Sequence, residues 1–464
     1  MKTPINPNLT ADYADYADTK CKEEFYLRYL RYLRLDRSSM KHRTIAVLFT
    51  AFAYACGFAE QTTAEVTLAI RGETVYTMAG DPIKNGIVLI EDGKIASVGD
   101  AATLIPGNVK TISAKVVTPG LIDAHTIVGL QGFENEPREN DLLDKSGPFQ
   151  PELRAFDAFN GQERLLEWIR GFGVTTIHTG PSPEALSTGQ TLIIKTAGPT
   201  VNDGVLKADA MVSITLGPAS LMKDVGEKGA KSPGTRAKQI AMLRAELIKA
   251  QEYTKKRAAK PQAATEGSSA KDDDKTPSRD LRLEVLVSVL NKEKPLLISA
   301  ERAQDILSAL KLKDEFKINI VLDLADEAYL LIDPIKAAGV PVIVHPTMKR
   351  AFGDSENISM ETAAKLKAAG IPFAFQSGYE PYVPKTRIIL FEAAIAVANG
   401  LKFEDALAAL TIDAAKILGV ADRVGSIEKG KDADLALFDG DPFEYTSHCV
   451  GTIISGKIVF EGKR

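Results

Sequence analysis

The chain has 464 residues, of which 45% are hydrophobic and 25% are charged, proportions typical of a soluble globular protein. Its net charge of −4 and pI near 5.9 exclude a strongly basic surface, so neither nucleic acid nor an anionic membrane is expected as a partner. The three cysteines, Cys21, Cys56 and Cys449, form no C-x-x-C pair, which excludes a disulfide framework and a cysteine zinc site.

The first 39 residues contain short tandem repeats, such as Ala-Asp-Tyr within residues 11–18. Repeats of this kind upstream of a second methionine predict a non-native or disordered extension over residues 1–39, with translation starting at Met40. The alternative is a helical N-terminal extension. No function is assigned to this segment.

Residues 40–59 have the three parts of a secretory signal peptide. A basic start at residues 41–43 precedes an uncharged apolar run, 44–55, which is shorter than the roughly 20 residues that a membrane-spanning helix needs. Ala53-Tyr54-Ala55 then offers a cleavage site, and Gly57-Phe58-Ala59 offers a second one. The sequence therefore predicts a periplasmic or secreted protein. The alternatives are lipidation at Cys56 and a buried helix of a cytosolic domain.

The remaining chain divides into two strand-rich ends and a mixed centre. Residues 66–118 and 425–464 alternate apolar and polar positions, and Asn85-Gly86 and Asp92-Gly93 each predict a hairpin turn. Between these ends, short β-rich runs alternate with helical segments, which predicts βα units and a parallel sheet. These runs are 174–178, 318–322, 340–345 and 371–375. Residues 254–280 predict a flexible insertion between helices at 235–253 and 281–291, because they are polar and lack apolar periodicity.

Two motifs carry a family resemblance. Thr118–His125 resembles the first-strand signature of the amidohydrolase superfamily, and residues 411–435 resemble its C-terminal signature. Thr188-Gly189-Gln190 and residues 302–307 are similar to the imidazolonepropionase-like branch. The resemblance implies an α/β fold, with a (β/α)₈ TIM barrel over residues 119–414 and a small composite β-sandwich from residues 66–118 and 415–464. It also implies hydrolysis of non-peptide or dipeptide-like C–N bonds.

The resemblance further implies a divalent metal ion, zinc above all, held at the carboxyl ends of the barrel strands. Histidines, a lysine or glutamate and an aspartate hold it, and the metal activates water. In this sequence His125 matches one such position. The others correspond to neutral or apolar residues, which are poor ligands: Ile127, Ser213, Ser299, Leu324, and Gly378 or Ser377. We therefore predict a degenerate centre with His125 as a residual ligand and with zinc weakly bound or absent.

Five further side chains are candidates for lining a substrate pocket: His178, His345, Ser299, Asp323 and Ser377. His178 and His345 end apolar strands and are expected at the barrel mouth. One alternative brings His125, His178 and His345 together in a rewired metal site. Another draws a metal-free acid–base pair from the acidic residues near strand ends, against the simpler account of solvated carboxylates and helix caps. Those residues are Asp123, Asp323, Asp326, Glu327 and Glu380. No residue is predicted as catalytic.

The sequence leaves two functions open. The first is an exported amidohydrolase-family enzyme with a reduced or rewired site. The second is a catalytically inactive binding or assembly module that keeps the same barrel, since a fold alone does not confer function. For both, the expected partner is a small-molecule substrate or ligand, and the resemblance adds a homo-oligomer as a further expectation.

Overall fold

The computed structural model describes residues 65–134, 136–221, 233–258, 278–345, 349, 351–379 and 389–462. They belong to one unit, Glu65–Arg464. The predicted N-terminal extension and signal peptide lie outside the described residues, as does most of the predicted insertion. In the part of the chain that the structure describes, no helix is long and apolar enough to cross a membrane.

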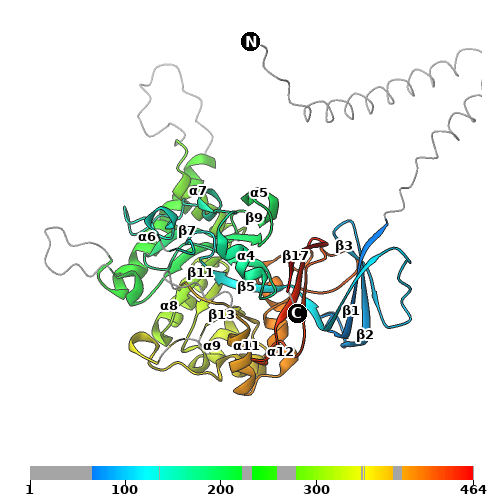
Figure 1. The fold of residues 1–464 in the computed structure, drawn as a ribbon. Helices are drawn as coiled ribbons and strands as arrows, with labels where there is room; N and C mark the ends of the chain where they lie inside the picture. Colours follow the sequence, from blue (N-terminus) through cyan, green and yellow to red (C-terminus); the bar gives the residue numbers. More distant parts are fainter. Residues whose placement is uncertain are drawn as a thin grey trace, which may run out of the picture. The chain divides into compact units, whose positions relative to one another are not determined.

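Both ends of this unit contribute strands to one seven-stranded sheet, in the order β17-β16-β15-β4-β1-β2-β3 (Figure 1). β4 joins the two sets, because it pairs in parallel with β1 and antiparallel with β15. The composite domain predicted from the two chain ends is therefore confirmed. The strands are β1 (Val66–Val75), β2 (Ile83–Glu91), β3 (Lys94–Gly99), β4 (Lys110–Pro119), β15 (Leu435–Phe438), β16 (Cys449–Ile454) and β17 (Lys457–Glu461).

One of the two predicted hairpin turns in this sheet is wrong. Asp92-Gly93 does connect β2 to β3, and both residues have the positive φ, 47° and 76°, that a tight hairpin requires. Asn85-Gly86, in contrast, lies inside β2, where Gly86 pairs with Gly72. A Cβ at Gly86 would lie 2.6 Å from Cγ2 of Val75, so this glycine permits close packing instead of a turn.

The barrel strands fall into a six-stranded sheet, β14-β13-β12-β11-β10-β7, and a four-stranded sheet, β5-β6-β8-β9. Backbone hydrogen bonds of Thr191 with Ala210 and Met211 connect the two sheets at one side. A bridge between Thr126 and Gly378 connects them at the other. The strands are β5 (Leu121–Thr126), β6 (Val174–Thr179), β7 (Ser187–Gln190), β8 (Leu192–Lys195), β9 (Val205–Lys207), β10 (Val212–Thr215), β11 (Leu296–Ala300), β12 (Ile320–Leu324), β13 (Val342–Val344) and β14 (Phe373–Phe375).

The third position around the barrel departs from the all-parallel arrangement that was expected. β7 and β8 follow each other along residues 187–195, and they pair antiparallel with β10 and β6, respectively. The short connection over residues 180–186 explains this direction. A parallel return needs a crossover of a dozen or more residues, usually a helix, and this connection is too short for one.

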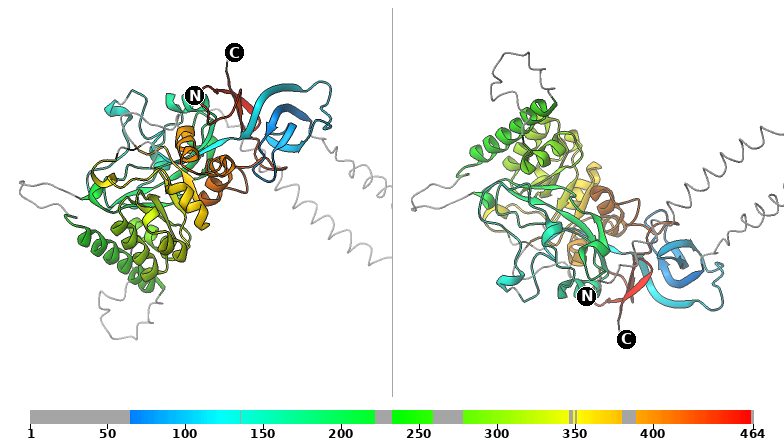
Figure 2. Two further views of the ribbon diagram at one scale, coloured as in Figure 1. Left: turned by 90° about the horizontal axis from the view of Figure 1, so that it is seen from below. Right: turned by 90° about the horizontal axis from the view of Figure 1, so that it is seen from above.

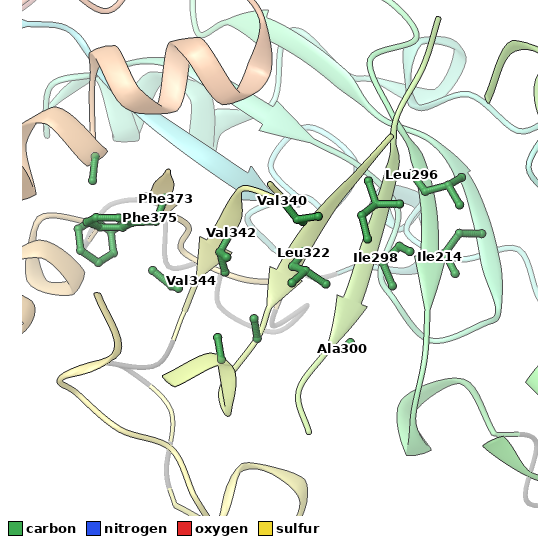
Figure 3. Packing of buried hydrophobic residues seen from close by; sticks show 14 of the residues in the cluster. Ile214, Leu296, Ile298, Ala300, Leu322, Val340, Val342, Val344, Phe373 and Phe375 are labelled. Atoms are coloured by element: carbon green, nitrogen blue, oxygen red, sulfur yellow. The ribbon is translucent and has the colours of Figure 1, made fainter. Parts of the chain in front are cut away.

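Helices cover the outer side of the strands (Figure 2). Outward-facing apolar side chains of the strands pack against them in the main hydrophobic core, for example Ile298, Leu322 and Val342 (Figure 3). The helices are α3 (Ala155–Ala158), α4 (Arg164–Arg170), α5 (Val201–Gly204), α6 (Arg236–Ala258), α7 (Leu281–Leu290), α8 (Ala303–Phe316), α9 (Ile332–Ala338), α10 (Thr362–Ala369), α11 (Ile389–Ala398), α12 (Phe403–Ala409) and α13 (Ile412–Leu418).

α6 runs further than the sequence predicted, so the start of the insertion at residue 254 was placed too early. The helix continues to Ala258. Thr254 Oγ1 donates to the carbonyl of Ala250 at 3.0 Å, and the Arg257 guanidinium lies over the Tyr253 ring, 5.5 Å from its centroid, as residues four apart on a helix can. The polar residues 254–258, which the sequence assigned to a linker, form the end of this helix.

A second apolar layer fills the inside of the barrel. It contains one residue from each of several strands, together with Ala414, Ala415 and Leu418 of α13. The strand residues lie at or near the amino ends of the parallel strands, except Ile193, whose strand β8 runs antiparallel, and α13 closes that end of the barrel. They are Ile122, Ile193, Met211, Leu297, Val321, Ile343 and Ala374.

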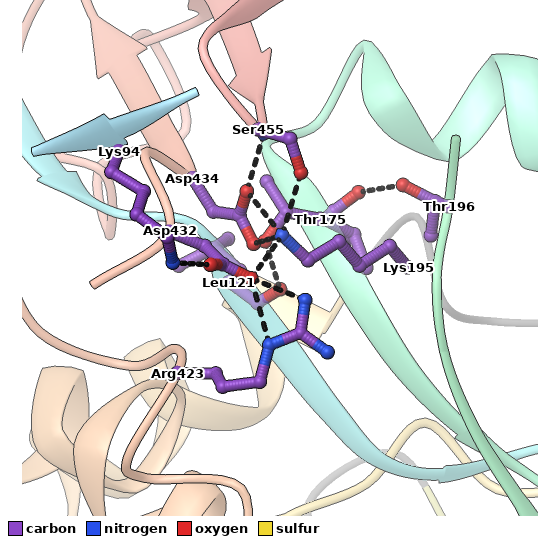
Figure 4. Close-up of polar contacts among 10 residues, drawn as sticks. Lys94, Leu121, Thr175, Lys195, Thr196, Arg423, Asp432, Asp434 and Ser455 are labelled. Atoms are coloured by element: carbon purple, nitrogen blue, oxygen red, sulfur yellow. Dashed lines mark hydrogen bonds and ion pairs between the residues drawn. The ribbon is translucent and has the colours of Figure 1, made fainter. Parts of the chain in front are cut away.

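A buried ionic cluster joins the barrel to the composite sheet (Figure 4). Lys195, at the end of β8, lies 2.9 Å from an oxygen of Asp432 and 2.8 Å from an oxygen of Asp434, and all three side chains are 6% exposed or less. Arg423 and Lys94 also contact Asp432, at 2.7 and 2.9 Å. Burial opposes the charge of Asp432, but hydrogen bonds from Lys195 and Lys94 outweigh it and lower its pKa to about 2.

Candidate functional site at the carboxyl ends of the strands

Directly above the inner apolar layer lies a layer of polar side chains. Side chains on a strand alternate with period 2, so the residue two positions after each apolar one also points inward. For five of the strands this residue is polar: Ser213, Ser299, Asp323, His345 and Gln376, and all of them are buried. Ligands of TIM barrels bind at this end of the strands. The polar layer is therefore the candidate functional site.

Asp323 is the centre of this layer. One carboxylate oxygen lies 3.0 Å from Nδ1 of His125 and accepts a hydrogen bond from Nε2 of Gln376 at 2.6 Å. The other oxygen accepts from the Ser299 hydroxyl at 2.5 Å. Asp323 thus ties β12 to β5, to β11 and to the end of β14. Leu324, which the sequence aligned with the ligand position of this strand, is the next residue, and it is the side chain of Asp323 that contacts His125.

His125 and Asp323 form a buried ion pair. Burial opposes a charge on His125, yet the charge of Asp323 and the hydrogen bond between them outweigh it, so the pKa of His125 is raised. Burial likewise opposes the charge of Asp323, but His125 and the hydrogen bonds from Ser299 and Gln376 lower its pKa. Nε2 of His125 has no hydrogen-bond partner among the residues that the structure describes.

His178 lies beside His125 but has a structural role. The two rings are 5.5 Å apart between centroids. Nδ1 of His178 bonds to the carbonyl of Ala124 and Nε2 to the hydroxyl of Thr191, each at 2.7 Å. Burial and the neighbouring charge of His125 lower its pKa to about 3, which keeps it neutral. Both ring nitrogens are engaged, so neither offers a lone pair to a metal.

His345 points to a different set of partners. Its Nδ1 lies 3.1 Å from the carbonyl of Gln376 and 3.0 Å from Oε1 of Glu392 on α11. The hypothesis of a site in which His125, His178 and His345 converge finds no support in these contacts. His125 and His178 are neighbours, whereas His345 turns towards α11.

The two positions at which the resemblance placed an aspartate are both constrained. The backbone N–H and the hydroxyl of Ser377 donate to the carboxylate of Asp123. Gly378 has a φ of +82°, and a Cβ at this position would lie 2.7 Å from Nε2 of His345. An aspartate at 377 would face the carboxylate of Asp123, and one at 378 would collide with His345.

The acidic residues near the strand ends also have partners. Asp326 and Glu301 form ion pairs with Lys349 at 2.9 and 2.6 Å. Glu327 accepts from the backbone N–H of Ala303 at 2.7 Å, which makes it a helix cap. Glu380 lies outside the described residues. Cap and ion-pair roles therefore account for these carboxylates better than a metal-free acid–base pair does.

Sequence reasoning missed several members of the site. Gln376 bonds Asp323 directly, and Glu392 faces His345. The period-2 spacing after Ala374 was a usable signal for Gln376, because it places that side chain in the inner row. No local signal pointed to Glu392, which comes from a helix distant in sequence.

The donor set of this site does not fit a zinc centre. Within the described ranges, no group of three or more His, Cys, Asp or Glu side chains is arranged to hold a metal ion. Nδ1 of His125 contacts one carboxylate oxygen of Asp323, and Ser299 and Gln376 donate hydrogen bonds to the same carboxylate. Ile127 is fully buried in the main hydrophobic core. A catalytic zinc site requires three protein ligands and an open position.

Comparisons with known proteins agree with this architecture. Residues 329–460 match the Amidohydrolase family model. The chain is 23% identical over 401 residues to an imidazolonepropionase of Thermoplasma volcanium, covering 82% of this chain and 92% of that protein. It is 24% identical over 402 residues to amidohydrolase tasK of Hapsidospora irregularis, but this alignment spans only 40% of that longer protein.

Among solved structures, an amidohydrolase of Thermotoga maritima superposes with a TM-score of 0.77 and 30% sequence identity, covering 85% of this chain and all of that one. Identity at this level over a whole chain goes beyond a shared fold. By homology the protein is a hydrolase of this family, and it resembles the imidazolonepropionase-like branch. The chain belongs to the amidohydrolase superfamily.

Proposed function

We propose that this amidohydrolase-family protein has lost metal-dependent hydrolysis and keeps its barrel as a metal-free binding module for a small molecule. The observation that carries the proposal is the bonding of Asp323. Its carboxylate is satisfied by His125, Ser299 and Gln376, so the oxygens that a metal ion would bind are already bonded to protein groups.

The residues at other expected ligand positions also favour loss of the metal centre. Ligand positions implied by the family carry Ile127 and Ser299, and hydroxyl and alkyl groups bind zinc poorly. A small molecule is proposed as the ligand by analogy with the relative named imidazolonepropionase. The second candidate, a hydrolase with a rewired site, has one observation in its favour, the unpartnered Nε2 of the buried His125.

Purified protein, expressed without a His tag, is expected to contain well below one equivalent of zinc, manganese or iron. Elemental analysis measures this directly. Chelators are expected to leave its melting temperature unchanged, because no metal contributes to the folded state. His448→Ala is the control, since this histidine is 75% exposed and lies outside the barrel, directly before β16.

Near-stoichiometric metal would contradict the proposal if it disappears in a His125→Asn variant and remains in His448→Ala. Such a result would favour the second candidate, a hydrolase with a rewired site. Should His125→Asn fail to fold, a melting temperature of the natural sequence that falls on addition of a chelator gives the same answer. Metal that is lost equally in both variants is adventitious and leaves the loss of the centre standing.

We also propose that the protein is exported after cleavage near Ala55 or Ala59, on the evidence of the basic, apolar and Ala-x-Ala series that begins at Met40. The mature protein is expected to begin near residue 56 or near residue 60. Mass spectrometry of the N-terminus, after expression of the full gene in a host with a secretion system, checks this. Protein that retains residue 1 in a cell extract would rule out export.

A further inference from the structure

An aromatic hollow lies outside the barrel, between α4, the segment that follows β5, and β17. We call it the aromatic corner; its volume is about 590 Å³, within the usual range of small-molecule sites. It shares no residue with the polar layer around Asp323. Its lining consists of Phe133, Arg164, Glu167, Trp168, Gly171, Phe172 and Phe460.

Two of its aromatic side chains are open to solvent, with Phe133 46% and Trp168 41% exposed. Trp168 contacts Phe133 at 5.7 Å and Phe172 at 6.2 Å between ring centroids, with ring planes at 77° and 73°. The ring plane of Trp168 is therefore nearly perpendicular to those of its two neighbours, and the rings form adjoining walls of the hollow. Large aromatic rings left exposed in a concave site are uncommon on a soluble protein and are typical of binding surfaces.

The charged residues of the corner balance each other. Arg164 lies over the Phe133 ring, 5.0 Å from its centroid, and 3.6 Å from a carboxylate oxygen of Glu134. Glu167 adds a second carboxylate to the lining. A strongly anionic ligand would meet the carboxylate of Glu167, and a cationic ligand would meet the guanidinium of Arg164. A purely apolar ligand would cover Arg164 and Glu167 without giving them hydrogen-bond partners, which is unfavourable.

The remaining class is a neutral molecule with an apolar face and a rim of hydroxyl groups. A hydroxyl both donates and accepts, so it can serve Glu167 and Arg164 together. A flat heterocycle stacks on one wall of a right-angled corner only. A pyranose ring presents C–H groups in several directions and can contact both walls. We propose that the aromatic corner is a carbohydrate-binding site, with Trp168 and Phe133 as its walls and Arg164 and Glu167 as its polar rim.

The test uses the full chain and its only tryptophan, Trp168, so that fluorescence reports from inside the corner. Cellobiose, maltose and chitobiose are titrated separately while the emission is followed. At least one of them is expected to change the emission saturably. Phe133→Ala and Glu167→Gln are each expected to weaken that binding about tenfold, because the first removes a stacking wall and the second replaces a charged hydrogen-bond acceptor with a weaker neutral one.

Phe391→Ala is the matched control, because Phe391 is 37% exposed but does not line the hollow. It is expected to bind as the natural sequence does, and circular dichroism confirms that all variants are folded. An absence of saturable change with all three sugars would overturn the proposal. So would a change that survives both Phe133→Ala and Glu167→Gln, or saturation by adenosine without any response to sugars. None of these outcomes depends on the metal content of the barrel.

Discussion

Replacing Asp323 with alanine is expected to lower the free energy of unfolding by about 3–5 kcal/mol, the usual cost of removing one partner of a buried ion pair. The variant removes the carboxylate that raises the pKa of His125, and it leaves Nδ1 of His125, the hydroxyl of Ser299 and the amide of Gln376 without their shared partner inside the barrel. Urea denaturation followed by circular dichroism measures the change.

Two further variants define the cause. Asp323→Asn keeps the shape and an acceptor but removes the charge, so its loss of stability should lie between those of the natural sequence and of Asp323→Ala. Asp314→Ala removes a carboxylate that is 68% exposed on α8, and it should change stability by no more than about 0.5 kcal/mol. If Asp323→Ala were as mild as Asp314→Ala, the polar layer would not be a bonded network.

The second large effect is expected at the joint between barrel and sheet. Lys195→Ala should lower the free energy of unfolding by about 3–5 kcal/mol, because Asp432 and Asp434 then remain buried without their shared cation. Lys94→Ala removes a cation from the same Asp432, but the Lys94 side chain is 56% exposed, so the expected cost is about 0–1 kcal/mol.

The comparison between these two lysines is the decisive measurement, since both contact one carboxylate at 2.9 Å. Thermal and urea unfolding of the two variants under the same conditions gives the difference. Equal losses would mean that burial does not determine the strength of this cluster. A loss in Lys195→Ala that is confined to a separate early transition would instead show that the sheet unfolds before the barrel.

Family and architecture were predictable because they depend on contiguous motifs. Thr118–His125 and residues 411–435 each carry a signature within one stretch of chain, and the strand-rich ends join in one sheet as expected. The reversed direction of β7 and β8 was not predicted. It follows from the length of one connection, and the alternation of apolar residues is the same for a strand in either direction.

The site was only partly predictable, for a related reason. His125, Ser299 and Asp323 were all singled out, but which of them touch depends on side-chain parity in strands that lie far apart in the sequence. Adjacent residues of a strand face opposite sides, so a shift of one residue in β12 decides whether Leu324 or Asp323 faces His125. Ser377 was likewise a candidate, yet its partner, Asp123, lies 254 positions away.

Gly378 constrains how this chain can evolve. A side chain at 378 must adopt a φ of +82° and must displace His345, whose Nε2 is 2.7 Å from the position of a Cβ. Mutations that place an aspartate there would therefore pass through poorly folded intermediates unless the region around His345 changes first. An aspartate at position 378 therefore requires a change around His345 in addition to the substitution itself, whereas positions without such a contact can change one at a time. The backbone conformation of one glycine thus restricts which side chains the segment after β14 can carry.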